Sequence, residues 1–126
     1  MRFLRTAASV QYTDAQRGKP FFVDYLGFSI SHEADGLVVV VRDEVPFMLE
    51  TNAEYAAQLS PLTRIHVDDI QALWAELASK PTHEDFTHPR FPNGPELREW
   101  GAWEFAVQDE GVCLVFQQWD ADATSD

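Results

Sequence analysis

The chain has 126 residues, of which 45% are hydrophobic and 13% aromatic, so it can bury one core and is too apolar to be mostly disordered. Nine basic and twenty-one acidic side chains give a formal net charge of −12, which excludes nucleic-acid binding and suits a cationic ligand, although it also fits plain solubility. A single cysteine permits no intrachain disulfide, and no stretch has the roughly 18 uninterrupted apolar residues of a membrane span. Composition therefore predicts a soluble, cytoplasmic, single-domain protein that contacts no membrane.

The sequence contains an internal repeat. Residues 10–16, VQYTDAQ, resemble residues 65–71, IHVDDIQ, at an offset of 55 positions, as between Val10 and Ile65. In both copies alternating apolar residues lead to an aspartate, Asp14 or Asp69, and then to a helical pattern. An aspartate at this place is typical of a helix N-cap, because its carboxylate accepts from the unpaired amides of the first turn. The repeat predicts two similar halves that each begin with a strand and a helix.

In the first half, residues 21–27 form an apolar helical face that closes at Gly27, a predicted C-cap. Pro20 fits either the first turn of a helix that begins near Lys19 or an irregular helix start. Three strands are expected after this helix, at residues 28–32, 37–42 and 47–50. Residues 51–61 form the predicted linker.

In the second half, a strand at 63–67 precedes a helix with one apolar stripe, which ends before Pro81. A loop rich in proline and aromatic residues leads to strands at 103–107 and 112–117, and residues 119–126 form a flexible tail. Each half therefore has the pattern βαβββ, with the strand after the second helix the least defined. The predicted class is α+β, in which module one (about 5–50) and module two (about 62–118) form a curved mixed sheet around a cup, with the helices on its convex side.

Several motifs resemble the vicinal oxygen chelate superfamily, which includes glyoxalases, extradiol dioxygenases and bleomycin-resistance proteins. Residues 21–28, FFVDYLGF, are similar to its Leu-Gly-Phe signature, and residues 66–69, HVDD, and 105–109, FAVQD, are similar to its second half. Residues 89–101, PRFPNGPELREWG, most resemble the bleomycin-resistance branch. The last turn, residues 109–111, departs from the family by being one residue shorter than the usual Asp-Pro-Asp-Gly.

The resemblance implies where a metal site would lie, because enzymes of this superfamily bind a metal through His and Glu on four strands. The corresponding positions fall near Ala7, Met48 or Leu49, Leu62 and Val115. None of these side chains can ligate a metal, and Glu50 is the nearest carboxylate. The four histidines have no metal-binding spacing. We therefore expect no metal and no cofactor, with a relocated metal site as the alternative.

Strand alternation predicts which side chains line the cup. Apolar members such as Val10, Ile65 and Phe116 should face the helices, so their polar neighbours face a ligand or simply solvent. In the bleomycin-resistance branch two chains pair to share two grooves, which implies a homodimer here with aromatic rings in the groove. The predicted ligand-binding residues are Ser9, Gln11, Phe47, Arg64, His66, Trp100, Trp103, Glu104, Cys113 and Gln117.

The leading hypothesis is metal-independent binding of a small molecule. A planar, cationic antibiotic of bleomycin type would be sequestered, which gives drug resistance without any catalytic residue. The alternative is a lyase or isomerase of the glyoxalase type with a relocated or missing metal site, in which His66 or Glu104 is the general base and Arg64 holds an anionic group. A third interpretation is an interaction module, because this fold hosts unrelated activities.

Overall fold

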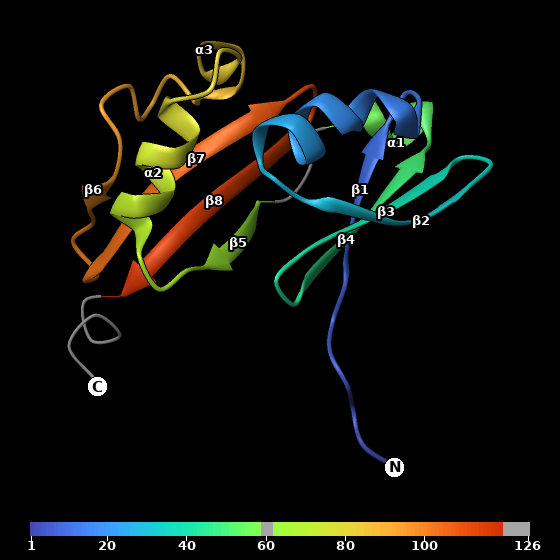
Figure 1. Ribbon diagram of the computed structural model, residues 1–126, viewed down its shortest axis with the longest axis horizontal. Coiled ribbons are helices and arrows are strands. Elements are labelled where there is room, and N and C mark those ends of the chain that lie inside the picture. Colours follow the sequence, from blue (N-terminus) through green and yellow to red (C-terminus); the bar gives the residue numbers. More distant parts are fainter. Residues whose placement is uncertain (59–61, 120–126) are drawn as a thin grey trace. The chain divides into compact units, whose positions relative to one another are not determined.

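The computed structural model describes residues 1–58 and 62–119 (Figure 1). The chain divides into two compact units, Met1–Ser60 with Glu110–Val112 and Pro61–Asp109 with Cys113–Asp126. The end of the predicted linker, residues 59–61, and the predicted tail from residue 120 onward lie outside the described residues. No helix in the described ranges is long and apolar enough to cross a membrane.

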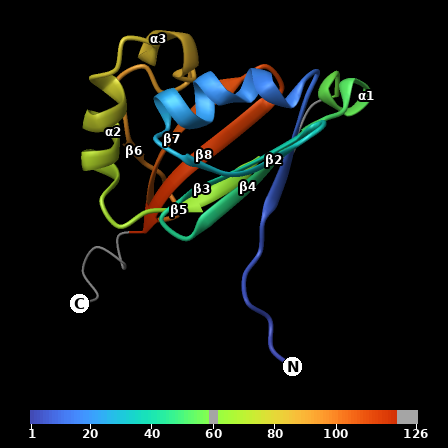
Figure 2. The same ribbon diagram turned by 45° about the vertical axis from the view of Figure 1, so that its right-hand side comes forward.

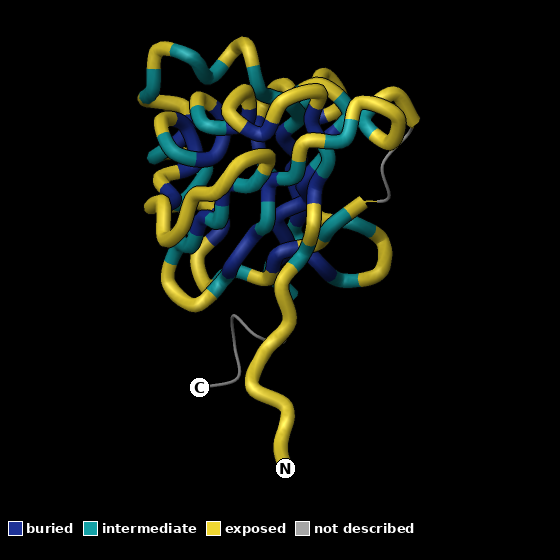
Figure 3. The backbone as a smooth tube through the Cα atoms, turned by 90° about the vertical axis from the view of Figure 1, so that its right-hand side faces the viewer, coloured by how far each residue is buried: buried dark blue, intermediate teal, exposed yellow. Residues whose placement is uncertain are grey.

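The first unit contains one four-stranded sheet with irregular helices against it. Its elements are β1 (Ala8–Tyr12), the 3₁₀ helix η1 (Ala15–Gly18), the π-helix η2 (Pro20–Tyr25), β2 (Ser29–Ala34), β3 (Leu37–Arg42), β4 (Val45–Thr51) and α1 (Ala53–Ala56). The strand order is β1-β4-β3-β2, with β1 parallel to β4 and β3 antiparallel to both of its neighbours. Buried positions lie in β1, β3, β4 and the helical segments η1 and η2, whereas β2 and residues 1–7, before β1, are exposed (Figure 3).

The first helical segment is irregular for reasons visible in the sequence. Asp14 accepts a hydrogen bond from the Gln16 amide at 3.0 Å, which confirms the predicted N-cap. Pro20 stands at the first position of η2, where its missing N–H leaves no helical hydrogen bond unmade. Gly27, with φ 77°, ends the segment in a conformation that favours glycine. Both predictions for Pro20 hold, because it lies in a first turn and the helix start is irregular.

Aromatic rings from η2 form the core of the first unit. The Phe22 ring lies 5.1 Å from that of Phe47 and 5.5 Å from that of Phe28, measured between centroids. Burying a ring of this size contributes about 1.5–3 kcal/mol. Phe47, predicted as a ligand-binding ring, is only 1% exposed. That prediction is wrong, because alternation along β4 sends Phe47 and Leu49 to the side that carries the helices.

The second unit repeats this architecture. It contains β5 (Thr63–His66), α2 (Ile70–Ala78), α3 (His83–Phe86), β6 (Glu96–Leu97), β7 (Ala102–Asp109) and β8 (Val112–Trp119). The order β5-β8-β7-β6, with β5 parallel to β8, has the same topology as the first sheet. The predicted α+β class with two βαβββ modules is confirmed, and the uncertain strand is the two-residue β6. The cup remains a prediction.

Helix α2 covers one side of the second sheet (Figures 1 and 2). Asp69 caps it by accepting from the Ala72 amide at 3.0 Å, as the repeat predicts. On the buried side, the Trp74 ring lies 5.1 Å from that of Phe105 of β7. Trp103 alternates with Phe105 and so belongs to the same side of β7. Trp103 is half-buried, and its predicted place among the rings of a shared ligand groove remains a prediction.

Candidate ligand-binding site

The candidate site lies on the side of the second sheet opposite α2. We call it the polar face and define it by Arg64 and His66 of β5, Glu104 of β7 and Gln117 of β8. All four are predicted ligand-binding residues. The parallel register of β5 and β8 places Arg64 beside Val115 and His66 beside Gln117, so these side chains come from adjacent strands.

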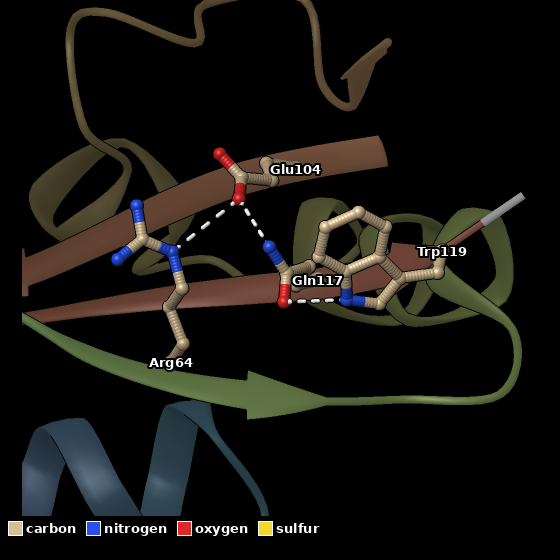
Figure 4. A network of polar contacts seen from close by, with 4 residues as sticks. All are labelled: Arg64, Glu104, Gln117 and Trp119. Carbon is tan, nitrogen blue, oxygen red and sulfur yellow. Dashed lines mark hydrogen bonds and ion pairs between the residues drawn. The ribbon is translucent and has the colours of Figure 1, made fainter. Parts of the chain in front are cut away.

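Three of these side chains form one network with Trp119 (Figure 4). Gln117 Nε2 donates to Glu104 Oε2 at 2.7 Å, and Arg64 Nε donates to the same oxygen at 3.4 Å. Trp119 Nε1 donates to Gln117 Oε1 at 3.0 Å. Because an indole N–H can only donate, this bond fixes which end of the Gln117 amide faces Glu104. The amide nitrogen is thereby directed at the carboxylate.

Burial differs sharply within the network. Glu104 and Gln117 are each 3% exposed, whereas the Arg64 side chain is 45% exposed. A carboxylate taken out of water needs hydrogen bonds or a close cation, because its desolvation costs several kcal/mol. Gln117 supplies one good bond, but Arg64 makes only a long contact, through Nε and not through its terminal nitrogens (Figure 4). The site therefore combines a well-fixed acceptor with a loosely held cation.

The surroundings of Glu104 are both acidic and apolar. Glu96 of β6 lies opposite Glu104 in the antiparallel register, so two carboxylates face each other across neighbouring strands. Ala106, which alternates with Glu104 along β7, and Val115 are buried small apolar residues on this face. A ligand placed here would meet an anionic edge above an apolar floor, which suits a cationic group on a flat apolar body.

The residues present do not fit the metal site that the resemblance implies. Its positions carry Ala7, Met48 or Leu49, Leu62 and Val115, and none of these side chains can ligate a divalent ion. Within residues 1–58 and 62–119, no group of three or more His, Cys, Asp and Glu side chains could hold a metal ion.

Two predicted residues lie on the first sheet, on the side of β1 opposite the helices. Gln11 donates through Nε2 to Glu50 Oε1 at 2.8 Å, while its own Oε1 is buried with no hydrogen-bond partner among the described residues. Ser9, the alternate residue along β1, is exposed. The sequence alone indicates Glu50 only as an insufficient metal ligand, and the register that places it opposite Gln11 gives it a clearer role as an acceptor.

The remaining predicted residues stand apart from the network. Trp100 is 44% exposed in the turn between β6 and β7, with the Arg98 guanidinium 4.9 Å from its ring centroid. Cys113 is partly buried, and this burial raises the pKa of its thiol. Trp119 was missed because the last strand was expected to end at residue 117. The continued alternation of Cys113, Val115, Gln117 and Trp119 was the signal that could have found it.

Comparison with known proteins gives structural matches alone. No protein-family model matches the sequence, and no curated protein matches it. The chain is similar to a bleomycin-binding protein from bleomycin-producing Streptomyces verticillus, solved with copper(II)-bleomycin, with a TM-score of 0.73 and 22% identity over 92% of this chain and 96% of that one.

Two further structures extend the likeness. The bleomycin resistance determinant encoded on the transposon Tn5 has a TM-score of 0.69 and 19% identity, covering 94% of this chain and 99% of that one. A glyoxalase/bleomycin resistance protein/dioxygenase from Alicyclobacillus acidocaldarius has a TM-score of 0.72 and 14% identity, covering 93% of this chain and 92% of that one. These likenesses confirm the predicted fold, which the chain shares with solved proteins of both kinds.

Proposed function

We propose that this chain, which has the fold of the bleomycin-binding and bleomycin-resistance proteins, binds and sequesters an antibiotic of bleomycin type without a metal of its own. The observation that carries the proposal is the buried Glu104–Gln117 pair, fixed by Trp119, on the polar face of the second sheet. Such a network holds a ligand by position and charge and needs no chemical step.

The charge distribution supports a cationic ligand. The chain carries a net charge of −12, which concentrates cations near its surface. On the polar face, Glu104 and Glu96 lie on adjacent strands, and the exposed ring of Trp100 lies in the turn that joins these strands. An exposed indole can stack on a flat heterocycle and adds about 0.5–1.5 kcal/mol to the burial of its area.

Metal independence is supported by the side chains at the positions where the superfamily's enzymes bind a metal. Methyl, thioether and branched alkyl groups stand at Ala7, Met48, Leu62 and Val115. The proposal also includes a cytoplasmic location and a homodimer, in which two chains share the binding grooves. Light scattering at micromolar protein concentration tests the dimer, and a mass of 14.3 kDa, that of one chain, would contradict it.

A titration of the purified, chelator-treated protein with metal-free bleomycin tests the function. We expect saturable binding at micromolar drug or below, which calorimetry and tryptophan fluorescence can measure. Glu104→Gln should weaken binding, whereas Glu54→Gln, which removes the same charge from an exposed site on α1, should not. Absence of binding would contradict the proposed ligand, and a transition metal retained stoichiometrically by the protein would contradict metal independence.

A further inference from the structure

Two ion pairs lie side by side on the polar face, and they differ in quality. Glu96 and Glu104 stand opposite each other on β6 and β7. Arg90 Nη1 holds Glu96 at 2.9 Å, although both side chains are half exposed. Arg64 reaches Glu104 at 3.4 Å through Nε, although Glu104 is almost fully buried. The more deeply buried carboxylate thus has the poorer cation, which is the reverse of what a purely structural pair requires.

Arg64 is free to move. Nearly half of its side chain is exposed, and its polar contact within the described residues is the single long one to Glu104. The contact to the carboxylate comes from Nε (Figure 4), and neither terminal nitrogen has a hydrogen bond to the described residues. Because Arg64 already lies half in water and bonds through one nitrogen, water solvates its released guanidinium well and its contact with Glu104 contributes little.

Glu104, in contrast, keeps its place when Arg64 moves. Gln117 donates to its Oε2 at 2.7 Å, and Trp119 locks the amide of Gln117. Glu104 Oε1 accepts no hydrogen bond from any residue in the described ranges. A planar guanidinium or amidinium can donate two parallel N–H bonds to a carboxylate, which is a far stronger arrangement than one long Nε contact.

We propose that Arg64 is a resident stand-in for a cationic group of the ligand: an amidinium, guanidinium or ammonium displaces it and takes its place against Glu104. This inference rests on the proposed ligand-binding role of the polar face and names the group that is recognised there. A cation that pairs with both oxygens of Glu104 takes the Oε2 that Arg64 contacts, and the repulsion between like charges favours the departure of Arg64. Binding is therefore a one-for-one exchange, and Arg64 competes with the ligand.

Competition between Arg64 and the ligand predicts a result that differs from the one expected if Arg64 bound the ligand directly. Removing Arg64 should tighten the binding of cations rather than weaken it. The probe is benzamidine, a flat ring with an amidinium, and the opposite charge is supplied by benzoate. In calorimetric or nuclear magnetic resonance titrations at low salt, Arg64→Gln should bind benzamidine about two- to fivefold more tightly than the wild type, because the displaced pair is weak.

Three matched variants complete the test. Glu104→Gln should weaken benzamidine binding about tenfold or more, because the charge-assisted bond is lost. Arg64→Lys, which keeps the competing cation, should stay near the wild type. Lys80→Gln, which removes a cation from the long, partly exposed pair with Glu76 just after α2, should change affinity less than about twofold. Circular dichroism confirms that each variant is folded before it is titrated.

The displacement has its own spectroscopic signature. The Nε–H signal of Arg64 should move to the position of a solvated arginine as benzamidine binds, with the same dissociation constant as the shift of the Trp119 indole N–H. Weaker benzamidine binding in Arg64→Gln would overturn the proposal. So would benzoate binding that depends on Arg64, or the absence of any Glu104-dependent benzamidine binding at millimolar probe.

Failure of the exchange proposal and failure of the proposed function give different results. Bleomycin that binds equally well to the wild type, Arg64→Gln and Glu104→Gln would leave sequestration standing and refute the exchange. If the benzamidine affinities of the variants fall in the predicted order but the protein does not bind bleomycin, the exchange is supported and the proposed antibiotic is refuted.

Discussion

The strength of the Arg64–Glu104 contact can be measured by a double-mutant cycle. At 3.4 Å two unit charges attract by about 1–5 kcal/mol for effective dielectric constants of 80 to 20. The Arg64 side chain is half exposed and bonds through one nitrogen, so solvent screening and side-chain entropy reduce the net contribution to about 0–1 kcal/mol. The Gln117–Glu104 bond is short and buried on both sides, and such a bond to a charged group contributes about 1.5–3 kcal/mol.

Urea unfolding at neutral pH of the wild type, the single variants and the double variants gives both coupling energies. Arg64→Gln with Glu104→Gln should yield a coupling below about 1 kcal/mol, and Gln117→Met with Glu104→Gln a coupling of at least about 1.5 kcal/mol. An Arg64–Glu104 coupling above about 2 kcal/mol would refute the reasoning, because a cation held so firmly would not be displaced by a ligand. A reversed order of the two couplings would refute it as well.

Three further predictions concern the fold around the site. Gly101→Ala, at φ 91° in open space, should cost about 1–2 kcal/mol of unfolding free energy. Gly94→Ala, at φ 101°, should cost about 1–3 kcal/mol more, because the added Cβ would lie 2.8 Å from Trp74. Equal losses would contradict the contact. Phe47→Leu should lower the free energy of unfolding by about 1–2 kcal/mol but leave bleomycin affinity unchanged. A loss of affinity without a loss of stability would show that Phe47 contacts the ligand. Burial raises the pKa of the Cys113 thiol, so its alkylation by iodoacetamide should reach half-maximal rate at a higher pH than that of free cysteine; a lower midpoint would contradict this.

The repeat was the part of the fold that sequence reasoning could predict best. Val10 and Ile65 both face the helices, and Asp14 and Asp69 both cap the segment that follows. These features depend on residues a few positions apart, so alternation and capping rules suffice to find them. The π-helical form of η2 was not predictable in the same way, because it follows from how several rings pack on a sheet that forms from later strands.

The candidate site was predictable in its members but not in its pairings. Alternation placed Arg64, Glu104 and Gln117 on one side of their strands, because each has an apolar neighbour that faces the helices, namely Ile65, Phe105 and Phe116. Which atoms meet depends on the register of three strands that are distant in sequence, and no local pattern sets that register. The aromatic predictions failed at Phe47 for the opposite reason: a large ring was assigned to the groove although its own alternation with Leu49 indicated the core.

Whether a bleomycin-type drug occupies the polar face is tested most directly by a nitrogen-15 spectrum of the chelator-treated protein during titration with metal-free bleomycin. The Gln117 side-chain amide and the Trp119 indole N–H should shift in a saturable manner, and Glu104→Gln should remove most of the binding. Tight binding that leaves both signals unmoved, or that survives Glu104→Gln intact, would place the drug elsewhere on the protein.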